Sequence, residues 1–168
     1  MLAPGQLDYN QEAQFYGVYG SNHPAQAASY FKPITDWLPN ARAEATSFAA
    51  HLNLTRPACA NALHFSCHLA PWGFQSIDTA IYMHWNGDFA SMLYLNHFEY
   101  TRNMTFARQT IWPLVDGLVN WCSCFLQRSK GADGSLRLDD WNPIDPDESG
   151  ENQEVHNPVR WNFCRHFD

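Results

Sequence analysis

The feature that most constrains this chain is a run of apolar residues that recurs with the period of an α-helix. Within residues 104–128 the apolar positions step by four, three, four, three and four residues, which places them on one helical face. Such a seam must pack against neighbouring helices, so it predicts a buried helix, with a kink at Pro113. The members of the seam are Ala107, Ile111, Leu114, Leu118, Trp121 and Phe125.

A second helical face is predicted near the start of the chain. Ser21-Asn22-His23-Pro24 has the composition of a helix start, with polar capping residues followed by a proline in the first turn. Pro33 is expected to bend this helix, and after Pro39 a separate Ala-rich helix is expected at residues 41–52. The apolar residues at helical spacing are Ala27, Tyr30, Phe31, Ile34, Trp37 and Leu38.

Residues 85–100 predict a further long helix. Only a few residues separate it from the helix predicted within residues 104–128, which we call the seam helix. The two are therefore expected to pack as an antiparallel helical hairpin. The residues that lie along one line of this helix are Phe89, Leu93, Asn96 and Tyr100.

The segments between the helices differ in kind. Residues 8–19 fit a short helix or an extended segment. Residues 53–80 mix Cys, His and Trp without a helical period, which is typical of a functional loop and is compatible with a short strand. Ser135-Leu136-Arg137-Leu138 follows a Gly-containing turn and predicts a short strand. An acidic loop at residues 139–154 then precedes a last helix that begins after Asn157-Pro158.

Composition narrows the classes of function. The formal net charge is −7 with 10 Lys and Arg, and the sequence lacks the clustered basic residues that a nucleic-acid backbone requires, so nucleic acid is not an expected partner. No apolar run is long enough to span a membrane, and the first residues have neither the basic flank nor the apolar run of a signal peptide. The 11 Phe, 7 Tyr and 7 Trp could fill helix interfaces or, where exposed, stack on sugar rings.

The cysteines and two Asn-x-Thr triplets bear on the cellular compartment. The cysteines, at positions 59, 67, 122, 124 and 164, are odd in number and include no CxxC pair, so neither a zinc knuckle nor a closed disulfide set is predicted. Most are expected to be buried thiols. The triplets Asn53-Leu54-Thr55 and Asn103-Met104-Thr105 would matter only in a secreted eukaryotic protein. Localisation is left open, with the extracellular space and the secretory pathway among the alternatives.

The succession of helix pairs with aromatic and acidic loops between them resembles the six-hairpin glycosidases, and among them the α-L-fucosidase-like group. The likeness runs over most of residues 8–165 and is sharpest at the Asn-containing segment near the start and at the Ser-Asn-His-Pro helix start. The matching segments are Asp8-Tyr9-Asn10, Phe15-Tyr16-Gly17-Val18-Tyr19, Ser21-Asn22-His23-Pro24, Tyr30-Phe31, Leu38-Pro39-Asn40-Ala41-Arg42 and Arg108 through Trp121.

The resemblance implies a toroid of inner and outer helices whose loops form a sugar-binding crater. The expected fold is therefore mainly α, a partial (α/α)6 toroid built of helical hairpins with long loops and a short strand pair. Residues 1–168 would form a single incomplete catalytic domain, because the expected helices are too few to close a twelve-helix ring. We expect the fragment to be inactive alone and to need the missing C-terminal part of the barrel or another chain.

The resemblance also implies where the catalytic groups lie. In that group an Asn-x-Asn element at the start of the first inner helix positions the attacking water with a downstream Asp, and a Glu in a later loop protonates the leaving oxygen. Asn10 matches the second amide, and Asp8 stands where the family often has the first, which leaves open whether an amide or the Asp8 carboxylate acts. Glu148 or Glu151 matches the acid, with Glu148 preferred, and a merely solvated acidic loop is the alternative.

The chemistry of inverting glycoside hydrolysis requires such residue types. A protonated carboxyl faces the leaving group and a water-orienting group lies opposite, roughly 6.5–9.5 Å away. His64 and His68 are four residues apart, but their non-helical context does not favour a metal site, and no cofactor is expected. Because His and Trp hydrogen-bond hydroxyls or stack on sugars, the candidate substrate-binding residues are His23, His64, His68, Trp72 and His84.

Two alternatives, one to the function and one to the fold, fit the sequence less well. A non-catalytic carbohydrate-binding or protein-interaction helical module would use the aromatic loop at residues 64–74 without proton transfer. A helical solenoid would explain the helix pairs, but the sequence has no repeat period. The primary hypothesis is therefore an inverting glycoside hydrolase that acts on an oligosaccharide or glycan.

Overall fold

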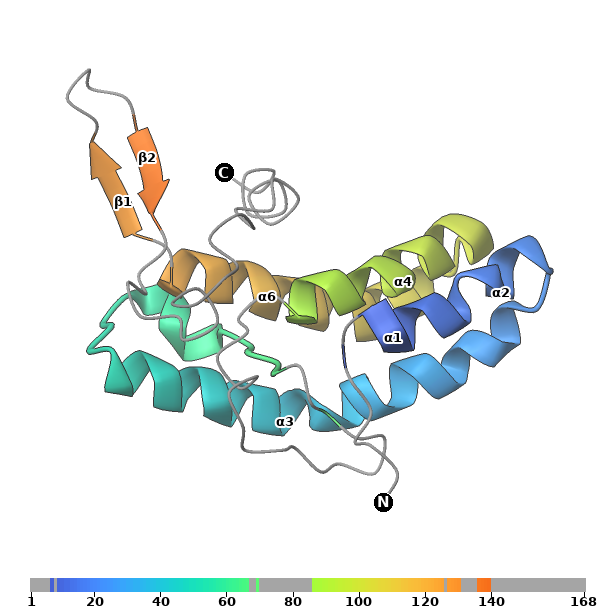
Figure 1. The fold of residues 1–168 in the computed structure, drawn as a ribbon, viewed down its shortest axis with the longest axis horizontal. Helices are drawn as coiled ribbons and strands as arrows, with labels where there is room; N and C mark the ends of the chain where they lie inside the picture. Colours follow the sequence, from blue (N-terminus) through green and yellow to red (C-terminus); the bar gives the residue numbers. More distant parts are fainter. Residues whose placement is uncertain are drawn as a thin grey trace.

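The structure is a computed structural model that describes residues 7, 9–66, 69, 86–125, 127–130 and 136–139, with side chains described for 7, 11–66, 69 and 86–125. These residues are mainly α-helical, and the long helices lie side by side (Figure 1). The helical elements are α1 (Tyr9–Glu12), the 3-10 turn η1 (Ala13–Phe15), α2 (Gly17–Gly20), the 3-10 turn η2 (Pro24–Ala27), α3 (Ala28–His51), the 3-10 turn η3 (Pro57–Asn61), α4 (Asn86–Thr101), α5 (Met104–Phe106), the π-helical turn η5 (Ala107–Ile111) and α6 (Trp112–Phe125).

The long helix α3 departs from the sequence prediction. It continues through Pro33 and Pro39 to His51, so the predicted separate helix at residues 41–52 is wrong. A proline inside a helix removes one hydrogen bond and costs about 3 kcal/mol or more. Burial along one continuous face of the helix offsets that cost. The buried residues of α3 are Tyr30, Phe31, Ile34, Ala41, Ala45 and Ala49.

The start of this helical segment is close to the prediction. Pro24 occupies the first turn of η2, with His23 at the N-cap position, and η2 leads directly into α3. The polar cap is absent, because no side chain hydrogen-bonds to the first turn of η2. The Pro24 ring therefore sets this boundary through its fixed backbone angle rather than through a capping side chain.

The seam helix forms over α5, η5 and α6, where the apolar spacing predicts it. Pro113 lies just after the π-helical turn η5, and a π turn is a common way for a helix to absorb a disrupted hydrogen bond. The helix ends at Phe125 rather than at residue 128. Ala107 is half-buried, and the buried members of the seam are Ile111, Leu114, Leu118, Trp121 and Phe125.

Helix α4 is present as predicted, but its buried face differs from the line of residues that the sequence suggested. Phe89 and Tyr100 are 38% and 47% exposed. Leu93 of that line is buried, and small residues near the start of the helix also face the interior, since a Cβ on Gly87 would lie 2.5 Å from Leu118 Cδ2 and 2.8 Å from Phe65 Cδ2. The buried residues of α4 are Asn86, Gly87, Asp88, Ala90, Ser91, Leu93 and Tyr94.

The segment α1–α2 and helix α4 run parallel to each other. The Tyr19 hydroxyl donates to the Leu93 carbonyl at 3.2 Å, and further along both segments the Tyr100 hydroxyl donates to Asn22 Oδ1 at 2.5 Å. Because the contacting residue numbers rise together, both segments run the same way, and Figure 1 shows them side by side.

Helices α4 and α6 form the predicted antiparallel hairpin. Tyr94 stacks on Phe106, with ring centroids 6.2 Å apart, whereas the earlier residue Gly87 packs against the later residue Leu118. Arg102 and Asn103 alone separate α4 from α5.

Helices α3 and α6 run parallel to each other. Phe31 packs against Phe106 with ring centroids 5.1 Å apart, and Phe48 packs against Trp121 with centroids 6.3 Å apart. The described helices therefore form two successive hairpins, α1–α2 with α3 and α4 with α6. The first helices of the two hairpins are parallel, and so are their return helices.

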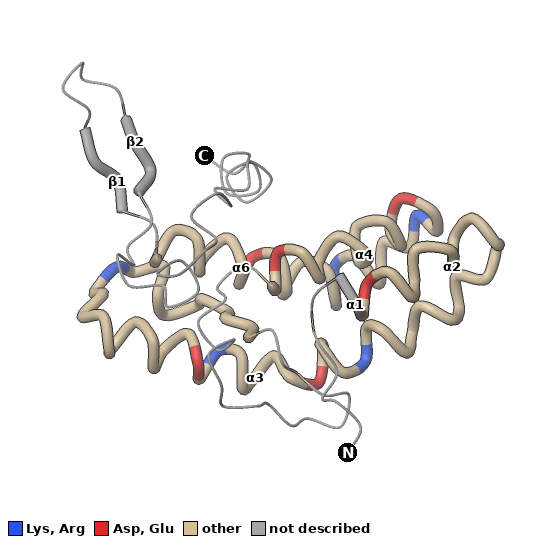
Figure 2. The backbone as a smooth tube through the Cα atoms, in the orientation of Figure 1, with Lys and Arg blue, Asp and Glu red and all other residues tan. Residues whose placement is uncertain are grey.

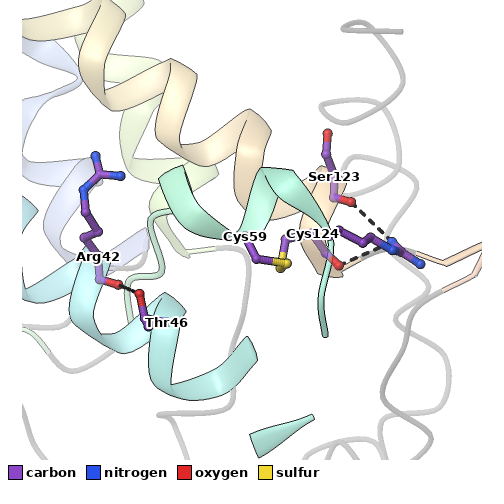
Figure 3. Close-up of a disulfide and its surroundings, with 6 residues drawn as sticks. Arg42, Thr46, Cys59, Ser123 and Cys124 are labelled. Carbon is purple, nitrogen blue, oxygen red and sulfur yellow. Dashed lines mark hydrogen bonds between the residues drawn. A yellow bond between two sulfur atoms is a disulfide. The ribbon is translucent and has the colours of Figure 1, made fainter. Parts of the chain in front are cut away.

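A disulfide between Cys59 and Cys124 joins η3 to the last turn of α6 (Figure 3). The two Cα atoms are 4.8 Å apart, a usual separation for a disulfide. Cys122 is also disulfide-bonded. The prediction that the cysteines are mostly buried thiols is therefore wrong for these three. An odd number of cysteines does not prevent pairing, and a sequence separation of 65 residues leaves no local pattern.

Arg56 supports the same junction. Its Nη1 atom donates to the carbonyl oxygens of Ser123 at 3.2 Å and Cys124 at 3.3 Å, and dashed lines at the labelled Ser123 and Cys124 mark these bonds in Figure 3. These carbonyls belong to the last turn of α6, where the helix itself supplies no donors. A positive side chain at this position also interacts favourably with the helix dipole.

Two short strands follow α6. β1 (Gln127–Lys130) pairs antiparallel with β2 (Leu136–Asp139), and Arg128 is opposite Leu138. β2 corresponds to the strand predicted at residues 135–138. None of the helices in the described ranges is both long enough and apolar enough to cross a membrane.

Candidate functional site

The structure describes only part of the predicted site. Asn10 lies in α1, with its backbone alone described. His23 is exposed at the start of η2, and His64 is buried. The predicted residues that lie outside the described ranges are Asp8, His68, Trp72, His84, Glu148 and Glu151.

A buried hydroxyl joins three elements close to Asn10. The Tyr30 hydroxyl lies 2.9 Å from Glu12 Oε1 and 3.0 Å from the Ala90 carbonyl oxygen, and it donates its one proton to either acceptor. Burial raises the pKa of Tyr30, as does the neighbouring Glu12 carboxyl, so the phenol stays protonated. This contact fixes α1 against the first half of α4, so Asn10 lies near the N-terminal end of α4, part-way along α3 and α6 (Figure 1).

Asp88 is a buried carboxyl at that same end. It belongs to the first turn of α4 and is 7% exposed. Its Oδ2 atom is 4.0 Å from Cys122 Sγ, a contact without a shared proton because Cys122 is disulfide-bonded. Its Oδ1 atom has no hydrogen-bond partner among the described residues. Burial raises the pKa of Asp88 well above the ordinary value for an aspartate, which favours the protonated acid.

His64 lies in the second part of the core, around the disulfide. Its ring packs between Phe48 and Trp121, with centroids 4.6 Å and 4.9 Å away, and its Nδ1 is 3.4 Å from Glu44 Oε2. Burial lowers the pKa of His64 to about 3, so the ring is neutral at pH 7 and its contact with Glu44 is a hydrogen bond rather than an ion pair. Here His64 is an interior residue, whereas His23 is accessible to a ligand.

Glu12 and Asp88 are the polar residues of this end that the sequence analysis missed. Charged side chains are sparse along the described helices (Figure 2), which makes two acidic residues in the interior notable. For Asp88 the sequence offered only a weak signal, since it stands near the small residues Gly87, Ala90 and Ser91 of a predicted helix. No comparable signal marked Glu12, which lies in a run without a clear period.

The buried carboxyl gives a testable pH dependence. A folded-state pKa above the unfolded value makes Asp88 costly as pH rises, because the folded protein must then bury a charge. We expect Asp88→Asn to become more stable relative to the wild type by about 1.4 kcal/mol per pH unit between the unfolded and folded pKa values. Urea unfolding from pH 4.5 to 8 measures this, with Asp116→Asn, an exposed position on α6, as the control for net charge.

Protonation of His64 changes the stability of the protein with pH in the opposite direction to Asp88. It does not disturb the comparison of Asp88→Asn with the wild type. His64 has a lowered pKa, so its effect makes the protein less stable as pH falls below about 6.5, and that effect is common to the wild type and the variant. A stability difference between Asp88→Asn and the wild type that stays constant over the pH range would show that Asp88 is not protonated in the folded state.

Within the described ranges, no group of three or more His, Cys, Asp or Glu side chains could hold a metal ion. His68 lies outside these ranges, so the expectation that His64 and His68 hold no metal is not tested. In comparisons with known proteins, no family model, no curated protein and no solved structure matches the chain.

Proposed function

We propose that this chain forms the first part of the catalytic domain of an inverting glycoside hydrolase of the (α/α)6 type, with an α-L-fucosidase-like active site. The observation that carries the proposal is the parallel course of α1–α2 and α4, the first helices of two successive hairpins. In a toroid of hairpins the inner helices are parallel and begin at one end, and the return helices form the outer layer. The arrangement of α3 beside α6 fits the outer layer.

The shared end of α1 and α4 is where we propose that the sugar binds. The contacts of Tyr30 bring α1 and the start of α4 together, and Asn10 is two residues before Glu12 in this assembly. In the proposed mechanism Asn10 or Asp8 orients the attacking water. Glu148 or Glu151, in the acidic loop, protonates the leaving oxygen, and the inverting reaction requires this carboxyl to lie across the sugar, roughly 6.5–9.5 Å from the water-orienting group.

The buried polar residues at this end would act as supports. The Glu12 carboxyl and the Tyr30 hydroxyl fix the position of α1, the helix that carries Asn10, along the axis of α4. Precise placement of a water-orienting group is what such a reaction requires, because small displacements of a catalytic group cost large factors in rate. Glu12 thus has a positioning role in this proposal, without touching the sugar.

The proposal also accounts for apolar side chains on the surface of the two hairpins. Phe89 and Met92 on α4 are 38% and 47% exposed, and Trp112 at the start of α6 is 68% exposed. Further hairpins of a closed ring would cover such side chains, since large exposed apolar groups favour burial against another surface. The two described hairpins would be one third of a six-hairpin toroid, so we expect activity only when the other hairpins are present.

The proposal is tested on a longer form of the protein that carries the further hairpins. A panel of aryl glycosides, with fucosides first, is expected to include a substrate, and proton NMR of the first-formed sugar is expected to show the inverted anomer. Asn10→Ala is expected to lower kcat/KM at least tenfold. The matched control is Asn40→Ala, at an exposed position on α3.

The alternative of a non-catalytic sugar-binding module gives a different result. It predicts binding to immobilised glycans without release of aryl groups from any member of the panel. A substrate that is hydrolysed with retention of configuration would contradict the inverting mechanism, and equal activities of Asn10→Ala and Asn40→Ala would contradict the role of Asn10.

A further inference from the structure

The Asn-x-Thr triplets of the sequence lie at exposed positions in the structure. Asn53 and Thr55 follow α3, and both are exposed. Asn103 and Thr105 lie at the start of α5, and both are exposed as well. An Asn-x-Thr triplet whose middle residue is not proline is the acceptor sequence for N-linked glycans, and such glycans require a surface position. Both triplets meet these requirements.

The disulfides indicate a compartment in which this modification occurs. Cys59 pairs with Cys124, and Cys122 is also disulfide-bonded. Disulfides form and persist in oxidising environments such as the endoplasmic reticulum, and they are rare in the cytosol. The endoplasmic reticulum is also where N-linked glycans are attached. The disulfides and the exposed triplets are independent observations that agree on one compartment.

Both asparagines are exposed, and each lies at a helix boundary. Asn53 has a positive φ of 55°, in the turn that closes α3, and its backbone N–H donates to the Ala50 carbonyl at 3.1 Å. Asn103 caps α5, with its Oδ1 accepting from the Phe106 N–H at 3.0 Å. A glycan is carried by the amide nitrogen Nδ2, so the Oδ1 atom remains available as the cap of α5.

We propose that Asn53 and Asn103 are N-glycosylated and that the chain is folded in the oxidising secretory pathway. The donor is an oligosaccharide linked to a polyisoprenyl pyrophosphate. A bond forms between the asparagine Nδ2 and C1 of the first sugar, the bond from C1 to the pyrophosphate oxygen breaks, and Nδ2 loses one proton. No oxidation or reduction takes place. This inference does not rest on the proposed hydrolase function, since it depends only on the triplets, their exposure and the disulfides.

The test is secretion of the chain from eukaryotic cells behind an added signal peptide. We expect two glycans, seen as two steps of mobility that peptide-N-glycosidase removes, and as conversion of Asn53 and Asn103 to Asp in peptide mass spectra. Thr55→Ala and Thr105→Ala are each expected to remove one step, whereas Thr55→Ser is expected to keep it. Asn40→Gln, at an exposed position outside any triplet, is the control and is expected to keep both steps.

The threonine variants keep the test independent of folding. Asn103→Gln would also remove the cap of α5, whereas Thr105→Ala leaves Asn103 in place. An unmodified asparagine in the secreted chain overturns the proposal at that site. Free thiols at Cys59 and Cys124 in the secreted chain overturn the disulfide on which the assignment to an oxidising compartment rests.

Discussion

Replacing both Cys59 and Cys124 by alanine is expected to lower the free energy of unfolding by about 4 kcal/mol. The two residues are 65 positions apart in sequence, so the disulfide closes a long loop and strongly restricts the unfolded chain. A loss of this size is a large fraction of the roughly 5–15 kcal/mol that stabilises a typical domain. Urea unfolding followed by circular dichroism measures it, and the slope of the unfolding free energy against urea is expected to rise as the unfolded state expands.

Reductant provides the control for this experiment. In the wild type it is expected to reproduce the loss seen in the double variant and to add the effect of the disulfide that involves Cys122. In the double variant, reductant should remove only the stabilisation by the disulfide that involves Cys122. The contributions of the two disulfides to stability can therefore be measured separately. Equal unfolding midpoints for the oxidised wild type and the double variant would contradict a stabilising role for the Cys59–Cys124 disulfide.

The long helices could be predicted because their apolar spacing reports directly on burial. In the seam helix, residues from Ile111 to Phe125 are buried at the predicted positions, and a short connection to α4 was enough to predict an antiparallel hairpin. The period of a helix and the length of a turn are local properties of a sequence. Local properties can be predicted without knowledge of the rest of the fold.

The errors arose where tertiary contacts outweigh local preference. Pro39 has the local character of a helix end, yet burial along α3 carries the helix through it. On α4 the large side chain of Phe89 is exposed, whereas Gly87 is buried against Phe65 and Leu118, which leave no room for a Cβ. In both cases the deciding partner is on a distant part of the chain.

In the candidate site, too, features set by the local sequence could be predicted and features set by tertiary contacts could not. Asn10 lies in the short helix α1, one of the two alternatives that the sequence left open for residues 8–19. The burial of His64 could not be predicted, because it depends on Phe48 and Trp121 from two other helices. Asp88 gave a weak signal at most. A buried carboxyl becomes evident only when the helices that exclude water from it are assembled.

Under the proposed hydrolase function, replacing Glu148 by Gln in a form of the protein that carries the further hairpins is expected to lower turnover at least a hundredfold and to leave sugar binding nearly unchanged. Glutamine has the size of glutamate but cannot donate a proton to a leaving oxygen, and loss of a general acid normally costs about 10²–10⁴ in rate. The same change at Glu151 provides the matched control within one loop, since only one of the two should be the acid. We prefer Glu148 for that role.

The leaving group distinguishes loss of the acid from a structural defect. Aryl glycosides whose phenols are already acidic need little protonation, so they are expected to lose much less activity in Glu148→Gln than glycosides with poor leaving groups. The alkaline limb of the pH profile of kcat/KM is also expected to change, because it reports ionisation of the acid in the free enzyme. A uniform loss over all leaving groups would indicate a misplaced loop, and full activity of both the Glu148 and the Glu151 variants would remove the acid from this loop.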